Sequence, residues 1–164
     1  MKQNWRKRVS WMSSLAVTLL LLIISSSPVL ATGSGHRHND KEMSEHMHSM
    51  MAVKEAIPDE YRIMERTPIF PGEKSLQQGS KLFLQNCSAC HGEKGDGKGP
   101  AAAALKPPPA NFLDKEHSGT YGPGEKYWII ENGIKKTGMP AFSKFSPSQR
   151  WHLVNYIFQL QEEN

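Results

Sequence analysis

The stretch CSACH, Cys87 to His91, contains both cysteines of the chain and places an imidazole directly after the second. Two thiols at this spacing fit four interpretations: a disulfide, part of a metal site, a redox dithiol, or an attachment point for a larger group. A tetrahedral zinc site needs four ligands, and the sequence has no second C-x-x-C or H-x-x-x-H to complete one. A thioredoxin-type dithiol belongs to a βαβ unit, of which this sequence gives no sign.

A disulfide explains this stretch poorly as well. It would close a very small loop, which gains little stability, and it would leave His91 without a function. Covalent haem accounts for all three residues, because thiols at i and i+3 share one helical face and can add to two vinyl groups. The next imidazole is then directed at the iron. The motif therefore predicts one haem c bound through Cys87 and Cys90, with His91 as an axial ligand.

The second axial ligand must come from the chain downstream of the motif, if the iron is to be six-coordinate. The candidates there are Met139, His117 and His152. The sequence TGMPAF places Met139 between Gly138, which permits close backbone approach, and Pro140, which stiffens the chain. We therefore predict Met139 as the sixth ligand.

The first residues have the features of a secretory signal peptide. Four basic residues precede the apolar run Leu15 to Ile24. Val29 and Ala31 are the small residues expected just before a cleavage site. The apolar run is about half the length of a membrane-spanning helix. The pattern predicts a signal peptide over residues 1–31 and export to the periplasm. An uncleaved signal that tethers the protein to a membrane is the alternative.

The formal net charge of +4 comes from this targeting segment, because residues 1–31 carry four basic residues and no acid. The exported chain is then close to neutral and has no stripe of Lys and Arg, so we exclude nucleic acid as a partner. Export also places the two thiols in an oxidising compartment, where free cysteines are normally captured by oxidation or by a ligand.

Residues 32–56 are polar and show no apolar period, which predicts a disordered linker. The linker is rich in histidine and methionine, whose side chains are suitable copper ligands. A second hypothesis is therefore a copper site in this tract. Its candidate ligands are His36, His38, His46, His48, Met47 and Met50.

The remaining chain predicts helices connected by long loops, with no convincing strand. Residues 57–72 are expected to be an N-terminal extension packed on the domain, and residues 73–164 to be the haem domain. A helix from Glu73 carries small and apolar residues on the face that leads to the thiols, and Gly79 within it indicates close approach of another helix. A second helix is expected from Glu125, ended by Asn132 and Gly133. Ser146 begins the last helix as its N-cap.

At this point the motifs CSACHGEKGDGKGP, PPPANF and TGMPAF, with the YWIIENG and WHLVNYI helices, resemble small bacterial single-haem cytochromes c of class I. The resemblance covers about residues 73–164. It implies an all-α fold, with three main helices plus loops around one covalently attached haem. It also implies that the terminal helices cross where Gly79 and Phe83 meet Tyr156, and that a proline carbonyl accepts the ring N–H of His91. The candidates for that carbonyl are Pro107, Pro108 and Pro109.

The expected site suits electron transfer rather than catalysis, because two axial ligands leave no position for a substrate. An apolar shell should surround the haem, and its candidates are Phe83, Leu105, Phe112, Trp128, Phe142 and Phe145. We predict a monomeric one-electron carrier, with no small-molecule substrate, that serves redox proteins or membrane-bound electron-transfer complexes. The alternatives are the haem subunit of a larger periplasmic oxidoreductase and a copper-handling protein. Lysines that would steer an acidic partner are Lys94, Lys98, Lys135, Lys136 and Lys144.

Overall fold

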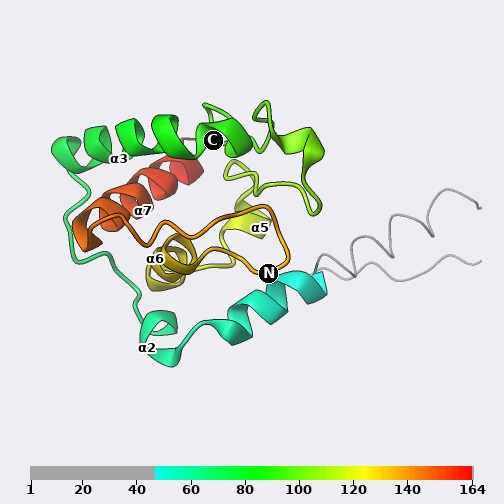
Figure 1. Cartoon of the computed structure of the whole chain (residues 1–164). Coiled ribbons are helices and arrows are strands. Elements are labelled where there is room, and N and C mark those ends of the chain that lie inside the picture. The colour runs from blue at the N-terminus through cyan, green and yellow to red at the C-terminus, as the bar shows by residue number, and fades with distance from the viewer. Residues whose placement is uncertain (1–46, 164) are drawn as a thin grey trace, which may run out of the picture. The chain divides into compact units, whose positions relative to one another are not determined.

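The computed structural model describes residues 47–163, so the predicted signal peptide and the first part of the His/Met tract lie outside it. Every regular element in the described range is helical, which confirms the all-α prediction (Figure 1). The elements are a helix over 47–56, α2 (Asp59–Arg62), α3 (Glu73–Asn86), α4 (Ser88–His91), the short 3-10 helix η1 (Ala102–Ala104), α5 (Lys115–Ser118), α6 (Pro123–Asn132) and α7 (Pro147–Glu162). Among residues 47–163, no helix has both the length and the apolar character needed to cross a membrane.

Helices α3 and α7 cross at a glycine, as the sequence predicted (Figure 1). A Cβ atom on Gly79 would lie only 2.1 Å from the carbonyl oxygen of His152 and 2.7 Å from Cβ of Tyr156. One turn further along α3, the fully buried ring of Phe83 packs against Tyr156, with 5.4 Å between the ring centroids. The contact explains why a residue that weakens an isolated helix stands in the middle of α3.

Polar side chains join this crossing to the chain that precedes α3. The hydroxyl of buried Ser75 lies 2.8 Å from Nδ1 of His152 and accepts a hydrogen bond from Nδ2 of Asn155 at 2.9 Å. The Asn155 amide also donates to the carbonyl of Ile69 at 3.0 Å. Because these groups are buried, each bond replaces one that water would otherwise provide.

The start of α7 follows the predicted capping box. Ser146 accepts the amide hydrogen of Gln149 at 3.2 Å, and the Gln149 side chain accepts the amide hydrogen of Ser146 at 2.8 Å. Pro147 occupies the first helical position, where its missing N–H costs nothing. The last helix therefore begins where its local sequence indicates.

Helix α6 begins two residues before the expected start. The Glu125 carboxylate accepts the amide hydrogen of Gly122 at 2.6 Å, so the helix begins at Pro123. It ends at Asn132 as expected, and Gly133 follows with a φ of 67°. A positive φ favours glycine, which accounts for the residue at this boundary.

Residues 47–56 form a helix, whereas the sequence predicted disorder as far as residue 56. Most of a helix's stability in a protein comes from tertiary packing, and two hydrogen bonds attach this helix to the rest of the domain. The Tyr121 hydroxyl donates to the carbonyl of Met50 at 3.0 Å, and Nζ of Lys54 donates to the carbonyl of Thr120 at 2.9 Å. The prediction of disorder is therefore wrong for this part of the segment, because contacts more than 60 residues away cannot be read from its composition.

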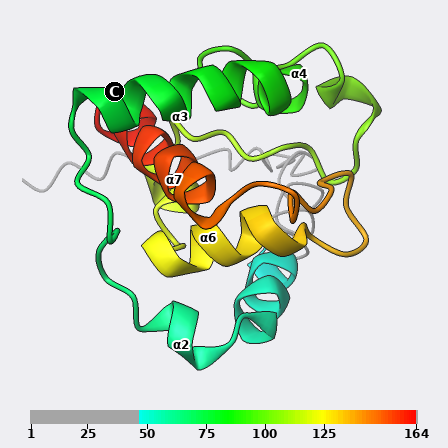
Figure 2. The same cartoon turned by 60° about the vertical axis from the view of Figure 1, so that its left-hand side comes forward.

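Residues 57–62 pack on α6, and Figure 2 shows α2 beside that helix. Ile57 is only 1% exposed, and the Tyr61 ring stacks on Tyr127 with 6.1 Å between centroids. A Cβ on Gly124 would lie 2.2 Å from the carbonyl oxygen of Tyr61. The glycine thus allows the backbones of α2 and α6 to approach each other closely.

Candidate functional site

The three predicted donors of the CSACH motif come from one turn at the end of α3 (Figure 2). The amide hydrogens of Cys90 and His91 are donated to the carbonyl of Cys87, at 3.1 and 2.9 Å. Both cysteines are free thiols and half-buried. The local chain therefore brings two thiols and an imidazole together within five residues.

A glycine-rich loop folds back on this turn. The amides of Gly97 and Gly99 donate to the carbonyls of His91 and Cys90, at 2.8 and 3.1 Å. A Cβ on Gly99 would lie 2.4 Å from the carbonyl oxygen of Ala89, so no side chain fits there. The loop satisfies carbonyls that the short helix leaves unpaired, and it holds the turn rigid.

His91 is oriented by a backbone carbonyl. Its Nδ1 lies 3.0 Å from the oxygen of Ala110, and because a carbonyl can only accept, Nδ1 carries the hydrogen. The free lone pair is then on Nε2, which is the arrangement of a metal-binding histidine. Burial lowers the pKa of His91, against a smaller opposing effect of the Ala110 hydrogen bond, and so favours the neutral ring.

The carbonyl partner corrects one prediction. The prediction placed the acceptor among Pro107, Pro108 and Pro109, whereas the structure places Ala110 there. The prolines fix an extended path, but the carbonyl that faces His91 depends on where the chain turns next. The Phe112 amide donates to Gly95 at 2.7 Å and sets that turn through a contact with the glycine-rich loop.

Two of the aromatic residues predicted for the apolar shell of the haem lie beside His91. The Phe112 ring stacks on the imidazole with 4.8 Å between centroids, and the Phe83 ring lies 6.5 Å away. Phe142 and Phe145 stack on each other at 5.3 Å and pack against the same hydrophobic core. Trp128 is half-buried on α6, and its contact with haem stays a prediction.

The thiol of Cys87 packs against the hydrophobic core as well. Burial, followed by the nearby Cys90, raises its pKa to about 12. The sulfur is therefore a protonated thiol at neutral pH, rather than the reactive thiolate of a catalytic cysteine.

Met139 lies in the loop between α6 and α7, which we name the methionine loop (residues 133–146). Its carbonyl accepts the amide hydrogen of Ile134 at 3.2 Å, and its own amide donates to the Thr137 hydroxyl at 3.2 Å. The side chain of Met139 is half-buried. These bonds make the tip of the loop a compact turn instead of a free strand of chain.

The methionine loop contacts the segment that follows the CSACH turn. A Cβ on Gly138 would lie 2.3 Å from Cδ2 of Leu105, so the Leu105 side chain packs closely on this glycine. Leu105 directly follows η1. Ala101, which directly precedes η1, donates its amide hydrogen to the carbonyl of Ala89 in the CSACH turn at 2.8 Å. The methionine loop therefore packs on the segment that is hydrogen-bonded to the CSACH turn.

The two alternative histidines take part in other interactions. His117 in α5 pairs with Asp114, with 2.8 Å between Nδ1 and Oδ2. His152 contacts Ser75 at the crossing of α3 and α7. The choice of Met139 over these two histidines stays a prediction.

The residues of the copper hypothesis are only partly described. His36, His38 and His46 lie outside the described range, and Met47, His48 and Met50 belong to the helix over 47–56. No cluster of three His, Cys, Asp or Glu side chains that could hold a metal ion occurs within residues 47–163. The copper site stays a prediction.

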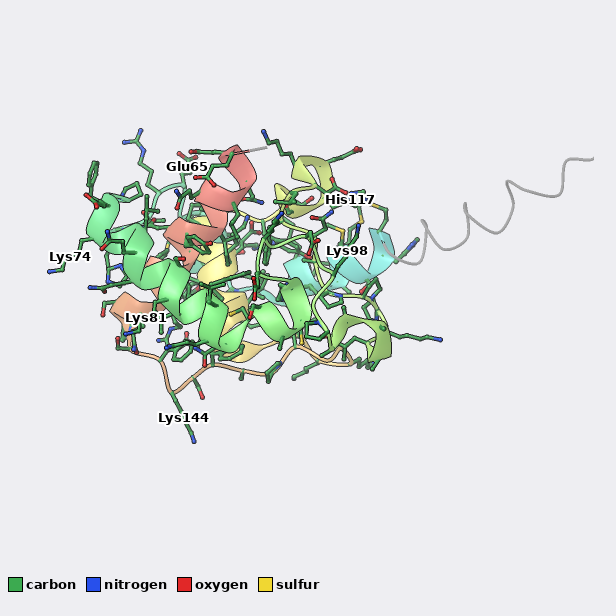
Figure 3. The ribbon with its side chains drawn as sticks, turned by 90° about the horizontal axis from the view of Figure 1, so that it is seen from above. Glu65, Lys74, Lys81, Lys98, His117 and Lys144 are labelled. Carbon is green, nitrogen blue, oxygen red and sulfur yellow. The ribbon has the colours of Figure 1, made fainter. Side chains whose placement is uncertain are left out.

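The lysines proposed to steer a partner are all exposed, and Figure 3 shows Lys144 extending away from the ribbon. Another lysine was not singled out from the sequence. Lys126 is 6% exposed, and its ammonium donates to the carbonyls of Ser118, at 3.1 Å, and Tyr121. It also lies 4.5 Å from the centre of the Phe158 ring. Burial, opposed by the nearby Glu125 carboxylate, lowers the pKa of Lys126 to about 8.

Comparison with known proteins identifies the family. Residues 76–161, about half of the chain, match the family model for cytochrome c. The chain belongs to the cytochrome c family. A solved chain of the Kuenenia stuttgartiensis reducing HAO-like protein complex is 28% identical, with a TM-score of 0.49. The match covers 57% of this cytochrome and 46% of that chain, so it spans less than half of the larger protein. A search of curated proteins finds no match.

A cytochrome c domain carries haem c attached covalently, and the donors present here fit that group. Two free thiols lie on one turn, a neutral imidazole is oriented through Nδ1, and aromatic rings line the site. A thioether is available from the methionine loop. The chain is therefore equipped for electron transfer through haem.

Proposed function

We propose that this cytochrome c is an exported one-electron carrier. Its haem c is attached through Cys87 and Cys90, and its iron is held by His91 and Met139. The observation that supports the proposal best is the orientation of His91, whose Nδ1 is committed to the carbonyl of Ala110 at 3.0 Å. This bond leaves Nε2 as the ligand atom, directly beside two free thiols on the same turn.

Haem c supplies a reversible Fe(III)/Fe(II) couple, and the residues of the chain determine how it is used. If His91 and Met139 both held the iron, no position would remain at which a substrate could coordinate. A thioether favours Fe(II) and raises the reduction potential relative to two imidazoles. The stacked Phe112 ring keeps water from His91 and limits the reorganisation that accompanies electron transfer.

The N-terminal sequence supports export to the periplasm, with cleavage after Ala31. The partners would be redox proteins or membrane-bound electron-transfer complexes, and the carrier would act as a monomer. Intact mass combined with a pyridine haemochrome spectrum tests the covalent site and the cleavage together. We expect one haem per chain, held by two thioethers, on a polypeptide that starts at Thr32.

Exposed apolar side chains favour a second candidate, the haem subunit of a larger oxidoreductase. Phe70 is 84% exposed and Ile63 is 76% exposed, both in the chain that connects α2 to α3. Apolar groups of this size on a surface often mark a protein contact. Size-exclusion chromatography of native extract separates the candidates, since a subunit elutes with its partner and a carrier elutes alone.

Replacement of Met139 by Ala tests the axial ligand. We expect Met139→Ala to lose the sulfur-to-iron charge-transfer band of the ferric protein and to bind added ligands, such as cyanide, that the native protein binds weakly. Met64, which is 38% exposed in the extension, provides a matched control, and Met64→Ala should keep the band. A band that persists in Met139→Ala would show that another group holds the iron.

A further inference from the structure

A buried arginine connects α6 to the methionine loop. Arg150 lies in the first turn of α7 and is 5% exposed. One guanidinium nitrogen donates to the carbonyl of Phe145 at 2.6 Å and lies 3.5 Å from the carbonyl of Ser143. The other donates to the Tyr127 hydroxyl at 2.8 Å and pairs with the Glu131 carboxylate, also at 2.8 Å. The same side chain therefore contacts α6 and the C-terminal end of the loop.

The opposite end of the methionine loop is attached to α6 as well. The loop starts at Gly133, immediately after α6, and the amide of Phe142 donates to the carbonyl of Ile130 at 2.9 Å. The loop thus leaves α6 and comes back to it at Phe142. Arg150 then joins the end of the loop, at Phe145, to Tyr127 of α6. The Phe142–Ile130 bond and Arg150 hold the end of the loop to the rest of the fold, whereas the turn around Met139 bonds mainly within the loop.

The N-terminal extension supports the group to which Arg150 binds. Tyr127 stacks on Tyr61 at 6.1 Å, and on Trp151 at 4.4 Å between centroids. The guanidinium of Arg150 lies 4.8 Å from the centre of the same Tyr127 ring. The ring is 7% exposed, so its hydroxyl has little freedom to move. Contacts other than Arg150 therefore hold the Tyr127 hydroxyl in place.

The chemistry of this contact requires arginine. A guanidinium offers five N–H donors in a planar fork, so that it can reach loop carbonyls and helix side chains at once. A lysine ammonium has one nitrogen and cannot span both. Because the arginine is buried, its removal would leave the Glu131 carboxylate and the loop carbonyls without their partner.

We infer that Arg150 is a positioning residue that holds the methionine loop closed, and so determines how readily Met139 leaves the haem iron. The inference rests on the proposed ligation of the iron by Met139. Arg150 touches neither the iron nor the thioether. It acts through the carbonyls of Ser143 and Phe145, which fix the loop that carries the ligand.

Lys126 is a matched control, because it is a second buried cation with a different attachment. It is 6% exposed, against 5% for Arg150, and it also donates to two backbone carbonyls and lies over an aromatic ring. Its acceptors, Ser118 and Tyr121, lie before α6 and outside the methionine loop. Loss of either cation leaves two backbone carbonyls without their donor, but only loss of Arg150 should free Met139.

The test is a titration of the ferric holoprotein with imidazole, which competes with the thioether for the iron. The loss of the sulfur-to-iron charge-transfer band is followed in the native protein, Arg150→Met and Lys126→Met. We expect imidazole to bind Arg150→Met about tenfold more tightly than the native protein, because the competing closed state is weakened. Its affinity for Lys126→Met should equal the native value. Urea unfolding of each protein measures the general loss of stability separately.

The outcomes distinguish this inference from the proposed function. A native protein without the band would overturn Met139 ligation and the inference together. A native band that Met139→Ala abolishes, with equal imidazole affinity in Arg150→Met and the native protein, would overturn the inference alone. An equal gain in Arg150→Met and Lys126→Met would also overturn it, since general destabilisation would then be the cause.

If Arg150→Met does not mature with haem, Arg150→Lys and Tyr127→Phe provide the same test. The first keeps the charge but loses the planar fork, and the second keeps the stacked ring but removes the hydroxyl that accepts from Arg150. Each should bind imidazole more tightly than the native protein. Native affinity in both variants would overturn the inference.

Discussion

The two sides of the proposed haem site are built in different ways. On the histidine side, Cys87, Cys90 and His91 lie on one turn, and the loop that caps the turn follows it directly. On the methionine side, Met139 sits in a loop that is closed by Arg150 from the next helix and packs against Leu105. The turn with the two cysteines is held mainly by neighbours in the sequence, whereas the methionine loop is joined to the rest of the fold by tertiary contacts.

This difference indicates which side should yield first when the fold is weakened. A turn closed by local hydrogen bonds keeps its donors together even when distant packing loosens. A loop held by distant contacts opens through a local, low-energy fluctuation. We therefore expect Met139 to be the labile ligand and the CSACH turn to be the permanent one, which suits covalent attachment at the turn.

The largest effect on haem content and folding should come from removing the two thiols of the CSACH turn. A double variant, Cys87→Ser with Cys90→Ser, keeps polar groups of similar size but cannot form thioethers. Because the haem would supply much of the core between the helices, we expect this variant to be colourless and largely unfolded. Absorption in the Soret region and far-UV circular dichroism measure the two properties. A folded, coloured double variant would show that the haem is held without these sulfurs.

A smaller but still large effect is expected where the two sides meet. Helix α3 leads to the CSACH turn, α7 carries Arg150, and the two cross at Gly79. Gly79→Ala would place a methyl group 2.1 Å from the carbonyl oxygen of His152, so we expect a loss of more than about 3 kcal/mol in the free energy of unfolding. Urea denaturation measures this loss. The exposed neighbour Gln78 supplies the control, and Gln78→Ala should change stability little.

Lys126 is buried outside both the histidine side and the methionine side, and it should make the free energy of unfolding depend on pH. The pKa of Lys126 falls from 10.5 to about 8 in the fold, so between these values the unfolded chain binds more protons than the native one. Stability should therefore rise from pH 8 to pH 10.5, by at most about 3 kcal/mol, as the buried amine loses its charge. Below pH 8 the amine is charged in both states, and the cost of burying it is constant. Lys126→Met should lack this rise, and the difference between its unfolding free energies and the native values isolates the effect.

The smallest effect is expected at the junction of the methionine loop and α7. Ser146 caps the helix by accepting the amide hydrogen of Gln149, and Ser146→Ala removes this bond. We expect a loss of about 1 kcal/mol in the free energy of unfolding. Ser146→Asp restores an acceptor and should recover most of it. Equal stability of the native protein and Ser146→Ala would mean that Arg150 and the packing of α7 fix the junction without the cap.

Predictions from the sequence succeeded where the cause was close in the chain or unusually restrictive. The Ser146 cap and the common face of Cys87 and Cys90 depend on residues three apart. Gly79 indicated a close crossing because few other circumstances justify glycine inside a helix. Predictions failed where a partner had to be chosen from distant segments. The sequence suggested that one of three consecutive prolines supplies the carbonyl that binds His91, whereas Ala110 supplies it.

The sequence by itself predicted the chemistry of this cytochrome c. Two thiols followed by a histidine lie within one helical turn, so the group they bind can be inferred without knowing the rest of the fold. It also determined where the main helices lie, through caps and apolar periodicity. Only the tertiary structure decided how those helices hold the methionine loop, which carbonyl orients His91, and that residues 47–56 form a helix against the domain. These features depend on groups that are far apart in the chain and meet only after folding, so their partners are selected by packing and burial.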